Sequence, residues 1–143
     1  MSSARTQTNG SVPYQFQLEL GVRDYECDLQ GIVNNAVYQN YLEHARHEYL
    51  KSVGLDFAEL HRQEINAVVT RIEIDYRHPL ASGNRFVVRL GVEQRGRFRV
   101  IFHQDIYRLP DQEHVVQAIV FGALLHDGKP VPLPPEMRDA IRH

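Results

Sequence analysis

The sequence predicts a single α+β domain in which one long helix accompanies an antiparallel sheet. One alternating strand pattern precedes a helical pattern over residues 36–53, and four further strand patterns follow it. Turn signals such as Arg95-Gly96 separate the later strands by only a few residues, and strands joined by short hairpins pair antiparallel. A length of 143 residues is typical of one domain.

The first strand pattern alternates apolar and polar residues, as a strand with one buried face does. Its apolar positions are Tyr14, Phe16, Leu18, Leu20 and Val22. The helix that follows, from about Ala36 to Val53, repeats apolar residues at steps of three and four, which gives one apolar stripe. Asn34 or Asn35 is the expected N-cap, and Gly54 is the expected C-terminal cap.

Four strand patterns then occupy the rest of the domain. They cover residues 67–77, 85–94, 97–109 and 114–126. Asp56 and Glu59 predict a short helix before them, because an acceptor followed three residues later by Glu is typical of a helix start. The last strand is almost wholly apolar, which predicts burial on both faces. One helix covers one face only, so a second copy of the chain is expected to cover Val87, Ile101 and Tyr107, with edge-strand pairing as one way to associate.

Composition limits the classes of function. The net charge is −2, so no basic excess indicates a nucleic-acid partner, and no apolar run is long enough for a membrane span. The first residues lack the apolar stretch of a secretory signal, and the single cysteine, Cys27, fits a reducing compartment. We therefore expect a cytoplasmic location. Residues 1–12 are expected to be disordered, 13–129 to form the domain, and 130–143 to form a Pro-rich tail with room for a short helix.

Asp28 is the strongest candidate for a catalytic group. An isolated Asp in a turn is most often a turn former. Here, however, the turn leads directly into the long helix, whose first N–H groups lack partners and carry partial positive charge. Tyr25, Val33 and Tyr38 make the surroundings partly apolar. A carboxylate beside such donors provides the groups that a site needs to hydrolyse a carbonyl compound.

Other candidate groups are weaker. Cys27 lies among acidic residues, which disfavour a reactive thiolate, so we interpret it as structural. His44 and His47 can share a helix face, but no HExxH or Cys/His cluster accompanies them, and neither a metal nor another cofactor is predicted. GxSxG and GxGxxG motifs are absent. Glu43 is either a solvated helix acid or a second carboxylate near the turn.

Three arginines, Arg95, Arg97 and Arg99, flank the predicted hairpin. They are either a solvated hairpin or a rim that contacts the phosphates of a coenzyme or of a carrier arm. The sequence leaves both interpretations open.

The run DYECDLQGIVNNAVYQNYLEHARHEYL resembles the hotdog-fold thioesterases of the 4-hydroxybenzoyl-CoA thioesterase type. It is especially similar to the plant acyl-lipid thioesterases and their bacterial relatives. The matching residues are Asp28, Gly31-Ile32-Val33, Tyr38 and Ala45-Arg46-His47-Glu48. The likeness extends from about Tyr14 to His126 and includes Tyr76–Leu80, which looks like the family's strand-end segment, but only the first run is specific.

The resemblance implies a hotdog fold, in which a curved antiparallel five-stranded sheet wraps around one long helix. It also implies a homodimer or homotetramer that hydrolyses acyl-CoA or acyl carrier protein thioesters at the subunit interface. Asp28 would be nucleophile or general base, and the helix start at Asn34 and Asn35 would hold the thioester oxygen. Residues expected to line the substrate, most simply a medium- or long-chain fatty acyl group, are Gly31, Val33, Tyr38, Tyr41 and Leu42.

Asn35 departs from part of the family, because several bacterial members have a His at this place. A His-assisted mechanism is therefore not expected. Two other functions stay open. A hotdog hydratase or dehydratase would need a positioned His beside an acid, and no His lies in the turn. A non-catalytic acyl-thioester-binding protein would bind acyl-CoA without turnover.

Overall fold

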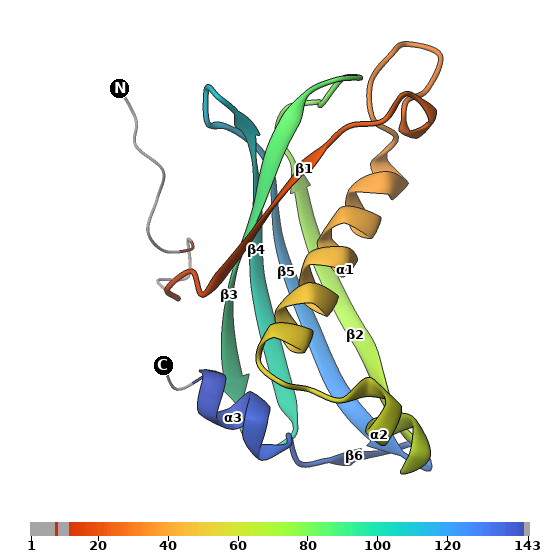
Figure 1. The fold of residues 1–143 in the computed structure, drawn as a ribbon, viewed down its shortest axis with the longest axis vertical. Coiled ribbons are helices and arrows are strands. Elements are labelled where there is room, and N and C mark those ends of the chain that lie inside the picture. The colour runs from red at the N-terminus through yellow and green to blue at the C-terminus, as the bar shows by residue number, and fades with distance from the viewer. Residues whose placement is uncertain (1–7, 9–11, 142–143) are drawn as a thin grey trace.

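In the computed structural model, which describes residue 8 and residues 12–141, one long helix lies across the concave face of a curved antiparallel sheet (Figure 1). The predicted α+β class and the order of strand, helices and strands are confirmed. The disorder predicted for residues 1–12 falls mainly on residues outside the described part. No helix among the described residues is long and apolar enough to cross a membrane.

The sheet has six strands in the order β1-β3-β4-β5-β2, with β6 paired to β5. Their bounds are β1 (Phe16–Gly21), β2 (Ile65–Tyr76), β3 (Arg85–Arg95), β4 (Arg99–Leu109), β5 (Glu113–His126) and β6 (Lys129–Val131). The five predicted strands are present, and β6 is an addition. It forms because Asp127 and Gly128, with φ values of 51° and 75°, turn the chain back along β5 instead of ending the sheet.

The helices are α1 (Asn35–Ser52), α2 (Phe57–Arg62) and α3 (Pro135–Ile141), and a short 3-10 turn, η1, covers Asp24–Glu26. The predicted bounds of the long helix are correct to within one residue at each end. The Asn34 side chain accepts the Ala36 N–H, and the Asp56 side chain accepts the Glu59 N–H, so both caps formed from side chains are confirmed. Gly54 follows the end of α1 with φ +92°, the conformation that makes glycine common there.

The core lies between α1 and the concave face of the sheet. Leu42 and Ala45 on α1 are fully buried, as is Phe86 on β3. One polar residue joins the two layers: Gln104 on β4 is 1% exposed and donates through Nε2 to the Leu42 carbonyl at 2.9 Å. The apolar stripe predicted for the helix is therefore the face that fixes α1 on the sheet.

The convex face was expected to need a second copy of the chain, but much of it is buried within one chain. Val87, Ile101 and Tyr107 are 4%, 1% and 4% exposed. The segment before β1 crosses this face at Gly91, where an added Cβ would lie 2.5 Å from the Pro13 carbonyl oxygen. The absence of a side chain at Gly91 lets the two backbones approach, so the chain's own N-terminal segment covers this part of the sheet.

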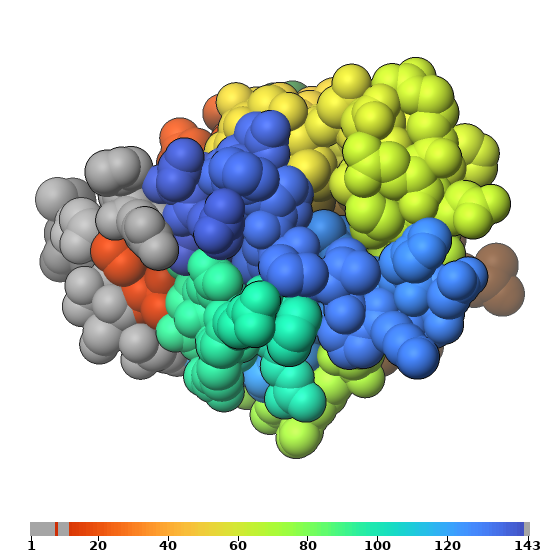
Figure 2. All heavy atoms as spheres, turned by 90° about the horizontal axis from the view of Figure 1, so that it is seen from below, coloured from red at the N-terminus to blue at the C-terminus, as the bar shows by residue number. Residues whose placement is uncertain are grey.

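The C-terminal tail belongs to the packed structure. Leu133 and Met137 are 2% and 3% exposed and join the core. The expected boundary between domain and tail, at 129/130, falls inside β6. Figure 2 shows α3 and the β3–β4 turn gathered at the end of the molecule where α2 also lies. The tail therefore closes this end, opposite the turn that contains Asp28 (Figure 1).

Replacing Gly91 with alanine tests the close approach on the convex face. Gly91→Ala is expected to lower the free energy of unfolding by about 1–3 kcal/mol, because the methyl group overlaps backbone that cannot easily move. Gly21→Ala is the matched control, since its Cβ would meet the flexible Arg85 side chain at 3.4 Å and the Asn84 carbonyl oxygen at 4.0 Å, which is ordinary contact. Urea unfolding measures both. An equal loss in the two variants would contradict the assigned course of the segment before β1.

Candidate active site

Asp28 begins a tight, exposed turn that precedes α1. Its N–H donates to the Ile32 carbonyl (2.9 Å), and the Gly31 N–H donates to the Asp28 carbonyl (3.0 Å). The side-chain oxygen Oδ1 accepts the N–H groups of Gln30 (2.8 Å) and Ile32 (3.4 Å). Gly31 has φ +80°, which favours glycine. The other oxygen, Oδ2, has no donor among the described residues, so the turn fixes the carboxylate and leaves one oxygen open.

The turn is held against the segment that follows β2. The Val33 N–H donates to the Leu80 carbonyl at 2.8 Å, and Ile32 forms a bridge with Ala81. Near the start of α1, the Tyr38 hydroxyl accepts the Leu80 N–H at 2.9 Å. Val33 and Tyr38 are each 3% exposed and Leu80 is fully buried. Val33 and Tyr38, both predicted site residues, therefore anchor the turn to the core.

The start of α1 offers an open amide beside this turn. The Asn34 side chain accepts the Ala36 N–H, and the Asn34 carbonyl accepts the Val37 N–H, both at 2.9 Å. The N–H of Asn35, an exposed residue, has no acceptor in the part of the chain that the structure describes. Asn34 is thus engaged as the cap, and Asn35 supplies the free donor and the partial positive charge of the helix start.

A groove of about 290 Å³ lies next to the helix start. It is lined by Ile32, Val33, Asn35, Tyr38, Tyr76, Arg77, His78 and Pro79. The Tyr76 hydroxyl donates to the Asn35 carbonyl at 3.4 Å, and His78 lies 2.6 Å from the Glu113 carboxylate. Neither Tyr76 nor His78 was predicted as a site residue. Their only sequence signal is that they fall in the family-like strand-end segment.

Tyr41 and Leu42, also predicted to line the substrate, face other surroundings. The Tyr41 hydroxyl donates to the Glu26 carboxylate at 2.8 Å. Burial and this carboxylate raise the pKa of Tyr41, so the hydroxyl stays protonated as a donor. Leu42 is fully buried in the core. Tyr41 therefore ties α1 to η1, and Leu42 packs α1 on the sheet.

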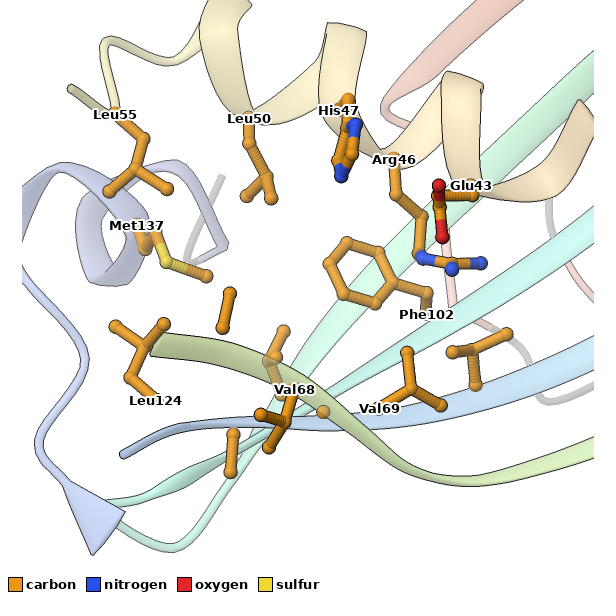
Figure 3. Close-up of a pocket in the computed structure, with 15 residues that line it drawn as sticks. Glu43, Arg46, His47, Leu50, Leu55, Val68, Val69, Phe102, Leu124 and Met137 are labelled. Atoms are coloured by element: carbon orange, nitrogen blue, oxygen red, sulfur yellow. The ribbon is translucent and has the colours of Figure 1, made fainter. Parts of the chain in front are cut away.

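A second cavity, of about 290 Å³, lies between the C-terminal half of α1 and the sheet. Figure 3 shows Glu43 and Arg46 toward one end and Leu55 and Met137 toward the other. Glu43 is exposed and lies eight residues along α1 from Asn35, about 12 Å at the helical rise. It is therefore not a buried second carboxylate beside Asp28 of the same chain.

Arg46, at the edge of this cavity, is a buried charge that the sequence interpretation missed. It is 8% exposed, and its Nη1 donates to Gln104 Oε1 at 2.9 Å. Burial lowers the pKa of Arg46, and the negative charge of Glu43 opposes that shift. The sequence could have indicated this burial, because Arg46 lies four residues from both Leu42 and Leu50 and so shares their buried face of the helix.

The hairpin arginines lie at the far end of the sheet from the Asp28 turn of the same chain. All three are exposed and line a groove of about 520 Å³ with Phe98. Arg95 pairs with Glu93 at 3.0 Å, and the Arg97 guanidinium lies 5.5 Å from the centre of the Phe98 ring. The structure thus brings the three arginines together, but not with Asp28.

In the part of the chain that the structure describes, Cys27 and the histidines belong to no cluster of three possible metal ligands. Cys27 is half-buried and its segment forms a bridge with Val33. Over the described residues, no three His, Cys, Asp or Glu side chains gather as a metal site requires.

One long helix against a curved antiparallel sheet, with a turn that fixes a carboxylate just before the helix start, is the arrangement expected of a thioester hydrolase of the hotdog class. The chain belongs to the Thioesterase-like superfamily, whose family model matches residues 22–141. The predicted family and fold are therefore confirmed.

Similar proteins agree with this assignment. The chain is 37% identical over 128 residues to the acyl-acyl carrier protein thioesterase ATL3, chloroplastic, of Arabidopsis thaliana, covering 89% of this chain and 67% of that protein. A thioesterase complexed with coenzyme A and Zn from Thermus thermophilus has a TM-score of 0.77 at 28% identity, covering 90% and 92% of the two chains. Slr0204, a 1,4-dihydroxy-2-naphthoyl-CoA thioesterase from Synechocystis, has a TM-score of 0.84 at 21% identity, covering 89% and 95%, and shows the fold alone.

The anchor between Tyr38 and the turn can be tested by removing one hydroxyl. Tyr38→Phe leaves the buried Leu80 N–H without an acceptor, so the free energy of unfolding is expected to fall by about 1–3 kcal/mol. Tyr25→Phe is the control, because Tyr25 also accepts an N–H, from Arg23, but is 76% exposed. Chemical unfolding of both variants gives the comparison. A Tyr38→Phe protein as stable as Tyr25→Phe would contradict the anchoring role.

Proposed function

We propose that the chain hydrolyses acyl thioesters at the Asp28 turn. The observation that carries the proposal is the open Asp28 oxygen in the turn that leads directly into the helix start, where the Asn35 N–H has no acceptor among the described residues. A fixed carboxylate supplies a nucleophile or a base, and a helix-start amide stabilises the negative charge that develops on the thioester oxygen. Membership of a thioesterase family, and a relative named as a thioesterase, support the same activity.

Two routes fit this arrangement. In the first, Asp28 Oδ2 bonds to the thioester carbonyl carbon, the C–S bond breaks and the thiol leaves, and water then hydrolyses the mixed anhydride to free acid and Asp28. In the second, Asp28 removes a proton from a water molecule that attacks the same carbon, the C–S bond breaks, and the thiolate leaves and takes up that proton to give the thiol and the free acid. In both, the Asn35 N–H donates to the carbonyl oxygen as it becomes negative. Neither route needs a cofactor.

The substrate class follows from the relatives and from the apolar surroundings. ATL3 is named for acyl carrier protein, and the Thermus thioesterase is complexed with coenzyme A. Acyl-CoA and acyl carrier protein thioesters present the same phosphopantetheine thioester to a site. Ile32, which is half-buried, and Tyr76, which is exposed, line the groove at the helix start with apolar surface, which suits a fatty acyl chain.

Asp28→Asn tests the central assignment. Hydrolysis of acyl-CoA is expected to fall at least about a hundredfold, because a neutral amide is neither nucleophile nor base here. The Asn oxygen can still accept the Gln30 and Ile32 N–H groups, so the turn should keep its shape. Asp127→Asn, in the exposed β5–β6 turn, is the control with the same loss of charge. Near-full activity of Asp28→Asn would refute the assignment.

A single turnover in heavy-oxygen water distinguishes the two routes. Label found in the Asp28 carboxylate requires the anhydride, because water has then attacked the Asp28 carbonyl carbon. Trapping the anhydride with hydroxylamine, which would modify Asp28, is the complementary measurement. A protein that binds acyl-CoA tightly and gives neither product nor label would be a binding protein instead.

We further propose that two copies of the chain pair through β2. This strand ends the sheet, and its outer backbone edge has no strand partner among the described residues. Arg99 is level with Val68 of β2, and about 26 Å of strand separates Val68 from Tyr76, beside the helix-start groove. Antiparallel pairing of two β2 strands would bring the partner subunit's Asp28 toward the arginine hairpin, which would then contact substrate phosphates there.

Mixed dimers test this shared site. Arg97→Ala/Arg99→Ala is expected to lower kcat/KM for acyl-CoA about tenfold or more, since each lost charged contact to phosphate is worth about a factor of ten. A dimer of one such chain and one Asp28→Asn chain should recover about half the wild-type value, because one site then combines an intact Asp28 with an intact hairpin. Activity no higher than that of the arginine variant would contradict sharing.

A further inference from the structure

A histidine paired with a carboxylate lies in the groove beside the helix start. His78 lines this groove together with Asn35 and Tyr76. Its Nε2 lies 2.6 Å from Oε1 of Glu113, the first residue of β5, and its Nδ1 has no partner in the described part of the chain. The two paired side chains are 51% and 40% exposed, and an ion pair so exposed contributes little to stability. The pair therefore adds little to the fold and leaves one ring nitrogen free for a ligand in the groove.

Two contacts hold the segment that carries His78 against the helix start. At one end of the segment, the Tyr76 hydroxyl donates to the Asn35 carbonyl at 3.4 Å. At the other end, the Leu80 carbonyl accepts the Val33 N–H at 2.8 Å. His78 lies midway between these contacts. It is therefore placed beside both the residues that close the turn and the residue that begins the helix.

The backbone of β5 fixes His78 next to its carboxylate partner. The His78 N–H donates to the carbonyl of Val115 at 3.3 Å, and Val115 is fully buried two residues after Glu113. Arg108 is opposite Glu113 on β4, but its guanidinium pairs with Asp111 at 2.6 Å. The Glu113 carboxylate is thus available to the imidazole, and a carboxylate at one ring nitrogen orients the other nitrogen.

We infer that His78 donates the proton that the leaving sulfur takes up, and that Glu113 positions the His78 ring. The inference rests on the proposed thioesterase activity and adds a catalytic acid from the segment that follows β2. In the proposed site, the Asn35 N–H holds the carbonyl oxygen, and the sulfur is bonded to the same carbon as that oxygen. The sulfur therefore leaves within the groove that His78 lines. No histidine lies in the turn itself, and the fold supplies one from a segment distant in the chain.

The proton balance closes on both routes. In the first, Asp28 bonds to the carbonyl carbon, the C–S electron pair goes to sulfur, and protonated His78 gives sulfur its proton. Neutral His78 then removes a proton from the water that hydrolyses the anhydride, which frees the acid and restores the Asp28 carboxylate and the protonated ring. In the second, His78 gives its proton to sulfur and takes up the proton that Asp28 removed from the attacking water. In both, a thioester and water become a carboxylic acid and a thiol.

The test varies how strongly the leaving sulfur needs a proton. It compares the octanoyl thioester of N-acetylcysteamine, an alkyl thiol like the end of phosphopantetheine, with that of thiophenol, a more acidic thiol that leaves readily as thiolate. Thiol release is followed in a single turnover with enzyme in excess, so later hydrolysis of an anhydride does not limit the rate. His78→Gln is expected to slow release of the alkyl thiol about a hundredfold, and release of thiophenol less than about threefold.

Two further variants accompany this one. Glu113→Gln is expected to slow release of the alkyl thiol about tenfold and to spare thiophenol, because the imidazole remains but loses the carboxylate that orients it. His126→Gln is the matched control, since His126 is 45% exposed and lies 3.6 Å from the Asp127 carboxylate but does not line the groove. It is expected to release both thiols at the wild-type rate. All three variants are expected to unfold at the same urea concentration as the wild type.

The outcomes separate the two proposals. If His78→Gln slows neither thiol, or slows both equally, while hydrolysis still depends on Asp28, this inference is overturned and the proposed activity stands. The same selective loss in His126→Gln also overturns it, because position in the groove would then be irrelevant. If neither thioester is hydrolysed in an Asp28-dependent way, the proposed function fails, and this inference fails with it.

Discussion

The structure depends on the contact between one face of α1 and the concave face of the sheet. Leu42 and Ala45 are fully buried in it, and the Gln104 side chain joins the layers by donating to the Leu42 carbonyl. This contact fixes the direction of α1 and therefore the point at which its first free N–H emerges. The stabilisation that an N–H donor gives to a carbonyl oxygen falls off quickly when the donor is misplaced. The order of a site at a helix start therefore depends on how well that helix is packed.

The elements of the fold were predictable because each depends on a local pattern. The alternation around Phe16, the three- and four-residue steps of α1 and the Asn34 cap are all visible within a few neighbouring residues. β6 was missed for the same reason: three residues that include Pro130 are too short to show a period. The burial of Met137 could not be read either, since it depends on where the tail meets the rest of the chain.

The candidate site shows the same division. The turn at Asp28 and the helix start at Asn34 and Asn35 were predictable, because they are adjacent in sequence and carry their own turn and cap signals. Tyr76 and Arg46 were not, since their roles depend on partners distant in the chain: Tyr76 contacts the Asn35 carbonyl, and Arg46 contacts Gln104. The arginine hairpin was recognised as a group, but its distance from Asp28 of its own chain follows only from the strand register.

Helix α1 also separates the helix-start groove from the cavity near its other end. Asn35, at its start, borders the groove beside the Asp28 turn, whereas Leu50 lines the second cavity fifteen residues later, about 22 Å along the helix. The intervening turns are held by buried contacts of Leu42 and Ala45, which a change near Leu50 does not touch. The start of a rigid helix can thus stay in place while the residues around its far end change. On this arrangement, the residues around the far end of α1 can change without disturbing the geometry at the carboxylate, as long as the central packing of α1 is kept.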